Sequence, residues 1–456
     1  MDSLAIIILA AGKGTRMKSD LVKVLHPVAG RPMLSFTLEL ARTLRPERLV
    51  VVVGFQRDLV RQRFSAPDLI FVDQEEQWGT GHAVVVAGQA LKNYRGNVLI
   101  LCADVPLLTE GTVRSFLQAH EDRRATLSVL TASLDNPWGY GRIVRGEAGE
   151  LLRIVEDKDL QAGEGKIREV NTGIYCVEAA FIFSALLSLS TQNAQREYYL
   201  TDIVGKASAQ GKKAYAFPAE DPIEVMGINT RLDLARANQV LWHKIAQGHM
   251  LAGVTLMDPH TTYIDRDVEI GKDTVVYPNC YLLGKTSLGE GCVVEPGCKL
   301  TDVRVGNFVT IKASCVITES VLEDRVVVGP FAHLRPETVL REGSRIGNFV
   351  EVKKSVIGKG TKANHLSYIG DATVGEEVNV GAGTITCNFD GRKKHPTIIE
   401  DDVFIGSNTE LVAPIKIGRG AVIGAGSTIT KEVPPETLAV SRARQEHYKK
   451  RPPRKD

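Results

Sequence analysis

Two glycines and three basic residues follow an apolar segment near the start of the chain. Residues 4–9 are apolar, and the sequence Gly-Lys-Gly at residues 12–14 is followed by Arg16 and then by Lys23. Glycine lets a backbone approach a phosphate closely, and Lys and Arg side chains neutralise phosphate charge. The segment therefore predicts a phosphate-binding loop.

This loop matches neither of the two common phosphate motifs. A Rossmann fingerprint needs a third glycine where Arg16 and Met17 stand, and a Walker loop needs a Gly-Lys-Ser/Thr ending that is missing. A glycine-rich turn without a ligand is the alternative interpretation. The positive charges at Lys13, Arg16 and Lys23 favour the phosphate.

Asp104 is a second candidate, because it follows the apolar segment 98–102. A carboxylate at the end of a buried strand is costly unless a cation or hydrogen bonds satisfy it. Mg²⁺ suits such a site, since one or two protein oxygens and substrate phosphates hold it. A helix cap before Pro106 is the alternative role.

His365 is the candidate general base of the C-terminal half. It stands in the sequence Asn-His-Leu-Ser-Tyr at residues 364–368, and neutral imidazole is the usual base near neutral pH. The competing candidate is His395, which lies between Lys394 and Pro396 in a polar segment. We expect His395 to face solvent.

The N-terminal half has the pattern of an α/β domain. Apolar segments at residues 49–53, 69–72 and 98–102 alternate with helical spacing, for example at residues 34–44 and 82–91. Buried strands that alternate with helices predict a mostly parallel sheet, and ligands of such sheets bind at the carboxyl ends of the strands.

The C-terminal half repeats every six residues from Ile264 to Ile429. A branched apolar residue recurs at the first position of each hexad, and a small residue follows four positions later. The first apolar positions are Ile264, Ile270, Val276, Leu282, Leu288, Val294 and Leu300. This period predicts a parallel β-helix in which three hexads close one triangular coil, because an α-helix needs a period near 3.6. The glycines that often follow the apolar position, such as Gly271 and Gly289, are expected to relieve backbone strain at the corners.

The repeat is broken in two places. Residues 386–396 form a polar excursion that is too long for a corner, and loops that leave a repeat stack usually serve function. Ala363 replaces a larger residue directly before the segment that contains His365.

Composition narrows the functional class. A net charge of +2 gives no reason to expect a nucleic-acid partner, and no segment is long enough for a transmembrane helix. The chain has seven Cys and no Cys-x-x-Cys pair, so a disulfide framework is not expected and a reduced cytoplasm fits. Four Cys fall in the small inward position of the repeat and are expected to pack in the core, with a metal column as the alternative: Cys280, Cys292, Cys298 and Cys315. The basic residues 442–456 predict a solvated tail rather than a nucleic-acid arm.

The motifs resemble two known families. Residues 9–17, Leu-Ala-Ala-Gly-Lys-Gly-Thr-Arg-Met, resemble the signature of sugar-nucleotide pyrophosphorylases, although Val22 replaces the usual Pro before Lys23. Matching motifs follow at residues 79–83, 103–107, 139–143, 154–158 and 169–174. The repeat resembles the hexapeptide acyltransferases, whose β-helices are left-handed. Nearly the whole chain resembles the bifunctional enzymes that join an N-acetylglucosamine-1-phosphate uridylyltransferase to a glucosamine-1-phosphate N-acetyltransferase.

The resemblance implies an α/β architecture followed by a β-helix, with these boundaries: a Rossmann-like nucleotidyltransferase domain over residues 1–230, a linker helix over 231–250, a left-handed parallel β-helix acetyltransferase domain over 251–441, and a basic tail over 442–456. It also implies a cytoplasmic homotrimer with acetyltransferase sites between subunits. The substrates would be UTP, glucosamine-1-phosphate, N-acetylglucosamine-1-phosphate and acetyl-CoA, with Mg²⁺ as cofactor.

In the N-terminal half the resemblance implies that Asp104 and Asn229 bind Mg²⁺ and that Arg16 and Lys23 stabilise the triphosphate. Uracil would contact Gln74, Gly79 and Thr80, and the sugar would contact Gly141, Glu156 and Asn171. The remaining substrate-binding residues would be Leu9, Ala10, Ala11 and Gly12. His82 is expected to be structural, because a phosphate nucleophile needs no base.

In the C-terminal half the resemblance implies that His365 is the base. The sugar phosphate would contact Arg335, Lys353, Tyr368 and Asn379. The acetyl-CoA groove would be lined by Ala382, Asn388, Phe389, Ser407, Ala425 and Arg442. Phe389 departs from the Tyr common in the family. Its ring could still stack, but it has no hydroxyl group with which to bind the ligand.

Two alternatives remain open at the level of sequence. A nucleotidylyltransferase whose β-helix only oligomerises or senses a regulator would not turn over acetyl-CoA. A β-helical scaffold with a degenerate nucleotide domain would release no pyrophosphate. The presence of Arg16, Lys23, Asp104 and Asn229 together argues against the scaffold.

Overall fold

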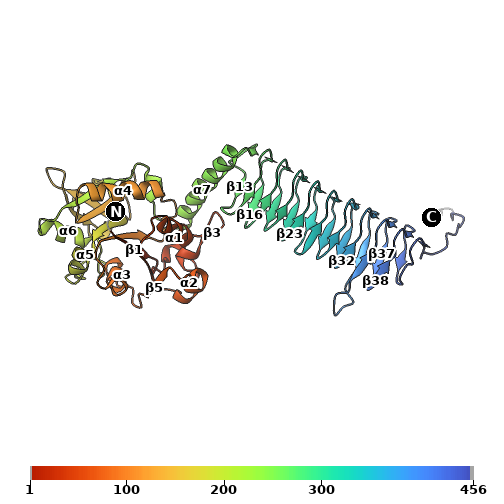
Figure 1. The fold of residues 1–456 in the computed structure, drawn as a ribbon, viewed down its shortest axis with the longest axis horizontal. Coiled ribbons are helices and arrows are strands. Elements are labelled where there is room, and N and C mark those ends of the chain that lie inside the picture. Colours follow the sequence, from red (N-terminus) through yellow and green to blue (C-terminus); the bar gives the residue numbers. More distant parts are fainter. Residues whose placement is uncertain (1–2, 452–456) are drawn as a thin grey trace, which may run out of the picture. The chain divides into compact units, whose positions relative to one another are not determined.

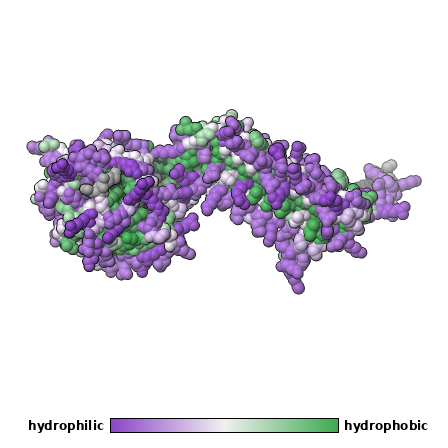
Figure 2. Space-filling model, viewed as in Figure 1, coloured by the Kyte–Doolittle hydropathy of each residue, from purple (hydrophilic) through white to green (hydrophobic). Residues whose placement is uncertain are grey.

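The computed structural model describes residues 3–451 (Figure 1). The chain forms two compact units, Met1–Leu241 and Trp242–Asp456, and the boundary lies inside the long helix α7 (Arg231–Leu251). No helix within residues 3–451 is long and apolar enough to cross a membrane. Hydrophilic residues cover most of the visible face of each unit (Figure 2).

The first unit is built on a nine-stranded mixed sheet with the order β11-β7-β10-β6-β1-β4-β5, to which β8 and β9 attach through β10. The strands are β1 (Leu4–Leu9), β4 (Arg48–Val53), β5 (Leu69–Asp73), β6 (Asn97–Cys102), β7 (Leu127–Ser133), β8 (Arg142–Arg145), β9 (Leu151–Val155), β10 (Glu169–Glu178) and β11 (Ala214–Pro218). Strand β1 runs parallel to β4 and β6, whereas β10 runs antiparallel to β6 and β7. The predicted α/β class is confirmed, but the predicted mostly parallel sheet includes antiparallel pairings, because β10 pairs with antiparallel neighbours and β8 and β9 form an antiparallel pair.

Helices cover both faces of this sheet. They are α1 (Met33–Thr43), α2 (Arg57–Phe64), α3 (Thr80–Ala87), α4 (Glu110–Asp122), α5 (Ala179–Leu186) and α6 (Asp202–Ala209). Short 3₁₀ helices and a small hairpin complete the unit: η1 (Thr15–Met17), η2 (Lys23–Leu25), η3 (Gly88–Leu91), η4 (Asp157–Asp159), η5 (Glu164–Lys166), η6 (Pro222–Val225), β2 (Pro27–Val28) and β3 (Arg31–Pro32). Along β1, Ile6 and Ile8 join one apolar core and Ala5 and Ile7 join the other. Burial on both faces explains why this strand is continuously apolar.

The second unit is a coil of three parallel sheets. The first sheet contains β12 (Thr255–Leu256), β15 (Val275–Val276), β18 (Val293–Val294), β21 (Thr310–Ile311), β24 (Val327–Val328), β27 (Arg345–Asn348), β30 (Lys362–His365), β33 (Asn379–Val380), β36 (Phe404–Ile405), β39 (Val422–Ile423) and β41 (Leu438–Ala439). The second contains β13 (Tyr263–Ile264), β16 (Tyr281–Leu283), β19 (Lys299–Thr301), β22 (Val316–Thr318), β25 (His333–Leu334), β28 (Glu351–Lys353), β31 (Tyr368–Gly370), β34 (Ile385–Cys387), β37 (Glu410–Val412) and β40 (Thr428–Ile429). The third contains β14 (Glu269–Ile270), β17 (Ser287–Leu288), β20 (Arg304–Val305), β23 (Ser320–Leu322), β26 (Thr338–Leu340), β29 (Val356–Ile357), β32 (Ala372–Val374), β35 (Thr397–Ile399) and β38 (Ile415–Ile417).

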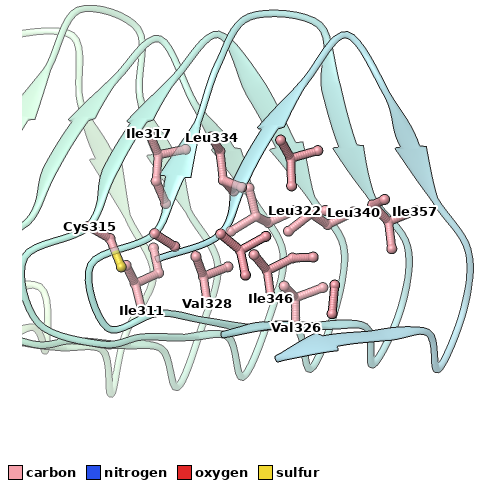
Figure 3. Close-up of a cluster of buried hydrophobic side chains, with 14 of the residues drawn as sticks. Ile311, Cys315, Ile317, Leu322, Val326, Val328, Leu334, Leu340, Ile346 and Ile357 are labelled. Carbon is pink, nitrogen blue, oxygen red and sulfur yellow. The ribbon is translucent and has the colours of Figure 1, made fainter. Parts of the chain in front are cut away.

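The apolar positions of the repeat form the core of this coil. Ile311, Val328 and Ile346 lie in register on successive coils and are buried, and Figure 3 shows them with their neighbours inside the coil. The four Cys predicted to lie in the core are buried there as well. The six-residue period therefore predicted the β-helix correctly.

The expected role of the glycines was wrong. A Cβ atom on Gly271 or Gly381 would lie 2.6 Å from the backbone of the next coil, whereas neither residue has a positive φ. The corners instead place residues such as Phe331, Phe349 and Leu366 at positive φ. These glycines are required because adjacent coils approach closely.

Candidate active sites

The first candidate site is a cleft of about 320 Å³ at the carboxyl end of β1. The predicted residues that line it are Leu9, Ala10, Ala11, Gly12, Lys23, Gln74, Gly79, Thr80 and Asp104. Gln77, Cys102 and Glu197 also line the cleft and were missed. Gln77 lies between predicted residues and could have been proposed, whereas nothing in the local sequence marks Glu197.

Four predicted residues converge on one point of the cleft. The Lys23 ammonium contacts the carboxylate of Asp104, and its Nζ lies 2.8 Å from Oδ1 of Asn229. Nη2 of Arg16 donates to the same amide oxygen at 2.9 Å. Gly14 adopts a φ of 68°, and a Cβ there would lie 2.6 Å from Cβ of Lys23, so glycine is needed for the Lys23 side chain to pack against the loop.

The start of α7 fixes the orientation of Asn229. Oδ2 of Asp233 accepts hydrogen bonds from the backbone N–H of Asn229 at 3.1 Å and from that of Thr230 at 2.8 Å. This cap satisfies amides that a helix N-terminus leaves without partners. Nδ2 of Asn229 donates to the carbonyl of Gly227 at 3.4 Å, which leaves the amide oxygen toward Lys23 and Arg16.

The oxygens of Asp104 and Asn229 could hold a divalent cation. Both already contact the same positive group, the Lys23 ammonium, so the two oxygens face a common point. One carboxylate and one amide oxygen suit Mg²⁺, which takes its other ligands from water and phosphates. Within residues 3–451 no group of three or more His, Cys, Asp or Glu side chains is arranged around a metal position.

The residues predicted to hold the sugar also lie close together. The backbone N–H of Asn171 donates to the carbonyl of Gly141 at 2.8 Å, and Oε1 of Glu156 accepts from Thr201 at 3.1 Å. A Cβ on Gly141 would lie 3.6 Å from both the Asn171 and the Glu156 side chains. Burial raises the pKa of the Glu156 carboxyl group. A Cβ on Gly141 would also lie 3.0 Å from Cγ2 of Ile154, so glycine lets this segment pack closely beside the two hydrogen-bonding side chains.

The segment predicted to contact uracil is anchored by the chain near Tyr198. Gly79 has a φ of 97°, and a Cβ there would lie 2.7 Å from the carbonyl oxygen of Tyr198. Oγ1 of Thr80 accepts from the backbone N–H of Leu200 at 3.2 Å. Gln74 is buried, with 4% of its surface exposed. Glycine is therefore required at position 79 by both its φ and the close approach.

The second candidate site lies on the β-helix at His365, the last residue of β30. Its Nδ1 lies 2.7 Å from Oδ1 of Asn348, which is in register with it on β27. Because an amide oxygen can only accept, Nδ1 carries the proton and Nε2 keeps a free lone pair. Ser367 also donates to the His365 carbonyl at 2.8 Å. This is the arrangement that a general base needs, and sequence reasoning missed Asn348.

A column of predicted residues continues from His365. Ala382, Ser407 and Ala425 each stand two positions after a residue of the register Ala363–Val380–Ile405–Ile423, and His365 stands two positions after Ala363. Nη1 of Arg442 donates to the carbonyl of Ala425 at 2.6 Å. These residues from separate coils therefore lie along one edge of the first sheet.

The predicted sugar-phosphate residues are divided between two sheets. Arg335 follows β25, while Lys353 and Tyr368 lie on β28 and β31 of the same second sheet. Nη1 of Arg335 pairs with Glu351 at 2.8 Å. Asn379 instead lies on β33 of the first sheet, in register with Lys362 rather than with His365. Within this chain Asn379 is therefore not brought together with the other three residues.

The excursion forms an ordered loop beside β34. Nδ2 of Asn388 donates to Asp371 at 2.6 Å, and Nζ of Lys394 lies 4.7 Å from the centre of the Phe389 ring. The prediction that His395 faces solvent is wrong, because only 19% of its side chain is exposed and its Nε2 lies 2.6 Å from Oδ2 of Asp390. The His395 hydrogen bond lowers the pKa of the Asp390 carboxyl group. With Nε2 engaged, His395 is less suited than His365 to act as a base.

Protein-family models match segments in both halves of the chain. Residues 6–169 match the MobA-like NTP transferase domain, residues 267–302 match the bacterial transferase hexapeptide (six repeats), and residues 396–431 match the hexapeptide repeat of succinyl-transferase. Hexapeptide repeats are consistent with a left-handed β-helix.

Three curated relatives match over nearly their whole length, and each is named bifunctional protein GlmU. The protein from Geotalea uraniireducens (strain Rf4) is 52% identical over 446 residues, which cover 98% of this chain and 98% of the relative. The protein from Geobacter sulfurreducens is 50% identical over 463 residues, covering 98% and 97%. The protein from Halalkalibacterium halodurans is 48% identical over 451 residues, covering 98% and 99%.

Proposed function

Because this chain belongs to the family of bifunctional GlmU proteins, we propose that its two units carry two successive reactions. The β-helix acetylates glucosamine-1-phosphate with acetyl-CoA. The N-terminal unit then transfers UMP from UTP to N-acetylglucosamine-1-phosphate and releases pyrophosphate. The observation that carries the proposal is the convergence of Arg16, Lys23, Asp104 and Asn229 in the cleft.

In the uridylyl transfer, a phosphate oxygen of the sugar phosphate attacks the α-phosphorus of UTP while the bond to the β-phosphate breaks. The nucleophile is already an anion, so the protein must align the two phosphates and neutralise their charge. Lys23 and Arg16 supply positive charge at the point where the phosphates meet. Asp104 and Asn229 would hold Mg²⁺, which supplies further charge neutralisation when bound.

In the acetyl transfer, the amine nitrogen of glucosamine-1-phosphate attacks the thioester carbonyl, and CoA leaves as its thiolate. Nε2 of His365 takes the proton that the amine loses, because its lone pair is free while Nδ1 donates to Asn348. Arg335 and Lys353 attract the sugar phosphate. The edge formed by Ala382, Ser407 and Ala425 receives acetyl-CoA.

We propose that the chain acts as a homotrimer in the cytoplasm. Support comes from a corner of the β-helix beside His365, where Phe331, Phe349 and Leu366 are exposed. The Phe331 and Phe349 rings stack with centroids 5.3 Å apart, so the corner presents a continuous apolar ridge. A second copy that covers this ridge would bury it beside the candidate base.

The test is a coupled assay on the purified full-length protein with glucosamine-1-phosphate, acetyl-CoA, UTP and Mg²⁺. We expect release of both CoA thiol and pyrophosphate. His365→Ala should lose thiol release but still make pyrophosphate from N-acetylglucosamine-1-phosphate, and Lys23→Ala should do the reverse. If the wild type releases pyrophosphate but no thiol, the β-helix has only an assembly or regulatory role.

A further inference from the structure

The carboxamide of Gln74 is held in one orientation by two acceptors. Its Nε2 lies 3.0 Å from the carbonyl oxygen of Gly79 and 3.2 Å from Nδ1 of His82. A carbonyl oxygen can only accept, so the Gln74 atom that faces it must be the NH₂ group. The second hydrogen of that group then points to the imidazole, and Nδ1 of His82 must accept it.

This arrangement leaves one polar atom of Gln74 for a ligand. Both hydrogens of the NH₂ group are used inside the protein, whereas Oε1 keeps its two lone pairs. Gln74 lines the cleft, and its Oε1 is not one of the buried polar atoms left without a partner, so this oxygen can be reached from the cleft and can accept a hydrogen bond from a ligand. The cleft therefore offers an acceptor at this position and no donor from the same side chain.

We propose that His82 is a positioning residue that sets the base specificity of the cleft by holding Oε1 of Gln74 toward the N3–H of uracil. The inference rests on the proposed function, because it takes the ligand to be a pyrimidine nucleotide. Uracil carries a hydrogen at N3, whereas cytosine has a lone pair there. With cytosine, two acceptors would face each other, and the Gln74 side chain cannot turn without losing its bonds to Gly79 and His82.

The residues around His82 hold its ring in place, so that Nδ1 can accept the hydrogen bond from Gln74. The residue lies in the first turn of α3, and its ring centre is 5.1 Å from that of Trp78 and 6.4 Å from that of Tyr198. Because Nδ1 accepts from Gln74, the ring is neutral and carries its hydrogen on Nε2. A purely structural His would need only to fill this space, which an apolar side chain of similar size also does.

The experiment compares UTP and CTP on the full-length protein, by calorimetric binding in the presence of Mg²⁺ and by pyrophosphate release with N-acetylglucosamine-1-phosphate. His82→Leu keeps much of the volume and removes the acceptor, while His82→Gln can still present an amide oxygen to Gln74. We expect the preference for UTP over CTP to fall about tenfold in His82→Leu, since a factor of ten corresponds to about 1.4 kcal/mol, the size of one hydrogen bond. His82→Gln should keep most of the preference.

A double-mutant cycle separates positioning from folding. In a Gln74→Leu background, His82→Leu should not change the UTP/CTP ratio further, because the group that His82 holds is gone. His243→Leu, on the exposed side of the C-terminal unit, is the matched control and should change nothing. Thermal unfolding of each variant shows whether it is folded.

Two results would overturn the inference. One is an unchanged UTP/CTP binding ratio in folded His82→Leu; the other is a wild type that binds both nucleotides equally. If His82 had only a structural role, its replacement would weaken the binding of UTP and of CTP by the same factor. If His82→Leu changes the UTP/CTP binding ratio but the wild type forms no pyrophosphate, the proposed function fails while the base-selection inference stands.

Discussion

The hydrogen bond between Asn348 and His365 gives the sharpest prediction for the β-helix. Asn348→Leu removes the acceptor that fixes the hydrogen on Nδ1, so the imidazole can rotate or place its hydrogen on Nε2. Asn348→Asp instead keeps the acceptor and adds a negative charge 2.7 Å from the ring nitrogen. The two variants therefore change orientation and charge separately.

The size of each effect follows from the geometry. A hydrogen bond between neutral groups contributes about 1 kcal/mol, so Asn348→Leu should slow acetyl transfer by about fivefold through kcat. His365 is exposed, so the charge in Asn348→Asp acts through water. At 2.7 Å Coulomb's law in water then gives roughly 1.5 kcal/mol in favour of the imidazolium. That energy should move the acid limb of the pH–rate profile upward by about one pH unit.

The assay is release of CoA thiol from acetyl-CoA and glucosamine-1-phosphate over about pH 5 to 9, which includes the range of about pH 5 to 8 in which imidazole titrates. Pyrophosphate release by the same preparations is the internal control and should equal that of the wild type. The reasoning is refuted if Asn348→Leu keeps the full rate of acetyl transfer. It is also refuted if Asn348→Asp leaves the acid limb where the wild type has it.

Three further predictions concern other parts of the chain. Lys23→Met should reduce pyrophosphate release about a hundredfold with thiol release unchanged, because it removes a cation aimed at the phosphates. Burial lowers the pKa of His120 from 6.5 to about 4, so the folded state binds this proton more weakly than the unfolded state. The free energy of unfolding should therefore be highest above pH 6.5 and should decrease by about 3 kcal/mol as the pH falls toward 4. Urea unfolding should show this decrease in the wild type but not in His120→Gln. Gly406→Ala would place a Cβ 2.5 Å from the backbone nitrogen of Ala425 and should lower the melting temperature, whereas Gly165→Ala, which has nothing within 4 Å of its Cβ, should not.

The β-helix could be predicted closely because its signal is local and periodic. Each coil repeats the same requirement for a branched and a small inward residue, so positions such as Ile311 and Val328 are marked by their spacing alone. The role of Gly381 could not be predicted from the same pattern. Its constraint comes from the backbone of the next coil, which lies 25 residues further along at Gly406 rather than at a fixed interval.

The convergence of Arg16 and Lys23 could also be predicted, since Gly14, Arg16 and Lys23 are close in sequence. Asn229 and Glu197 approach the same cleft only through tertiary structure, and no local pattern marks Glu197. His395 was misjudged for a related reason. Its flanking residues are polar, but the hairpin of the excursion brings Asp390 to its ring, an interaction that depends on the turn geometry.

Coil length decides whether the candidate base has its partner. Asn348 and His365 are 17 residues apart, which is one coil at this point of the helix, so both occupy the position two residues after a core residue. The same position recurs at Ala382, Ser407 and Ala425, although the loop after β34 lengthens one coil. Inserting one residue between Asn348 and His365 would move the imidazole out of register while leaving the composition of the site unchanged. The chemistry of the edge therefore depends on the count of residues per coil as much as on which residues are present.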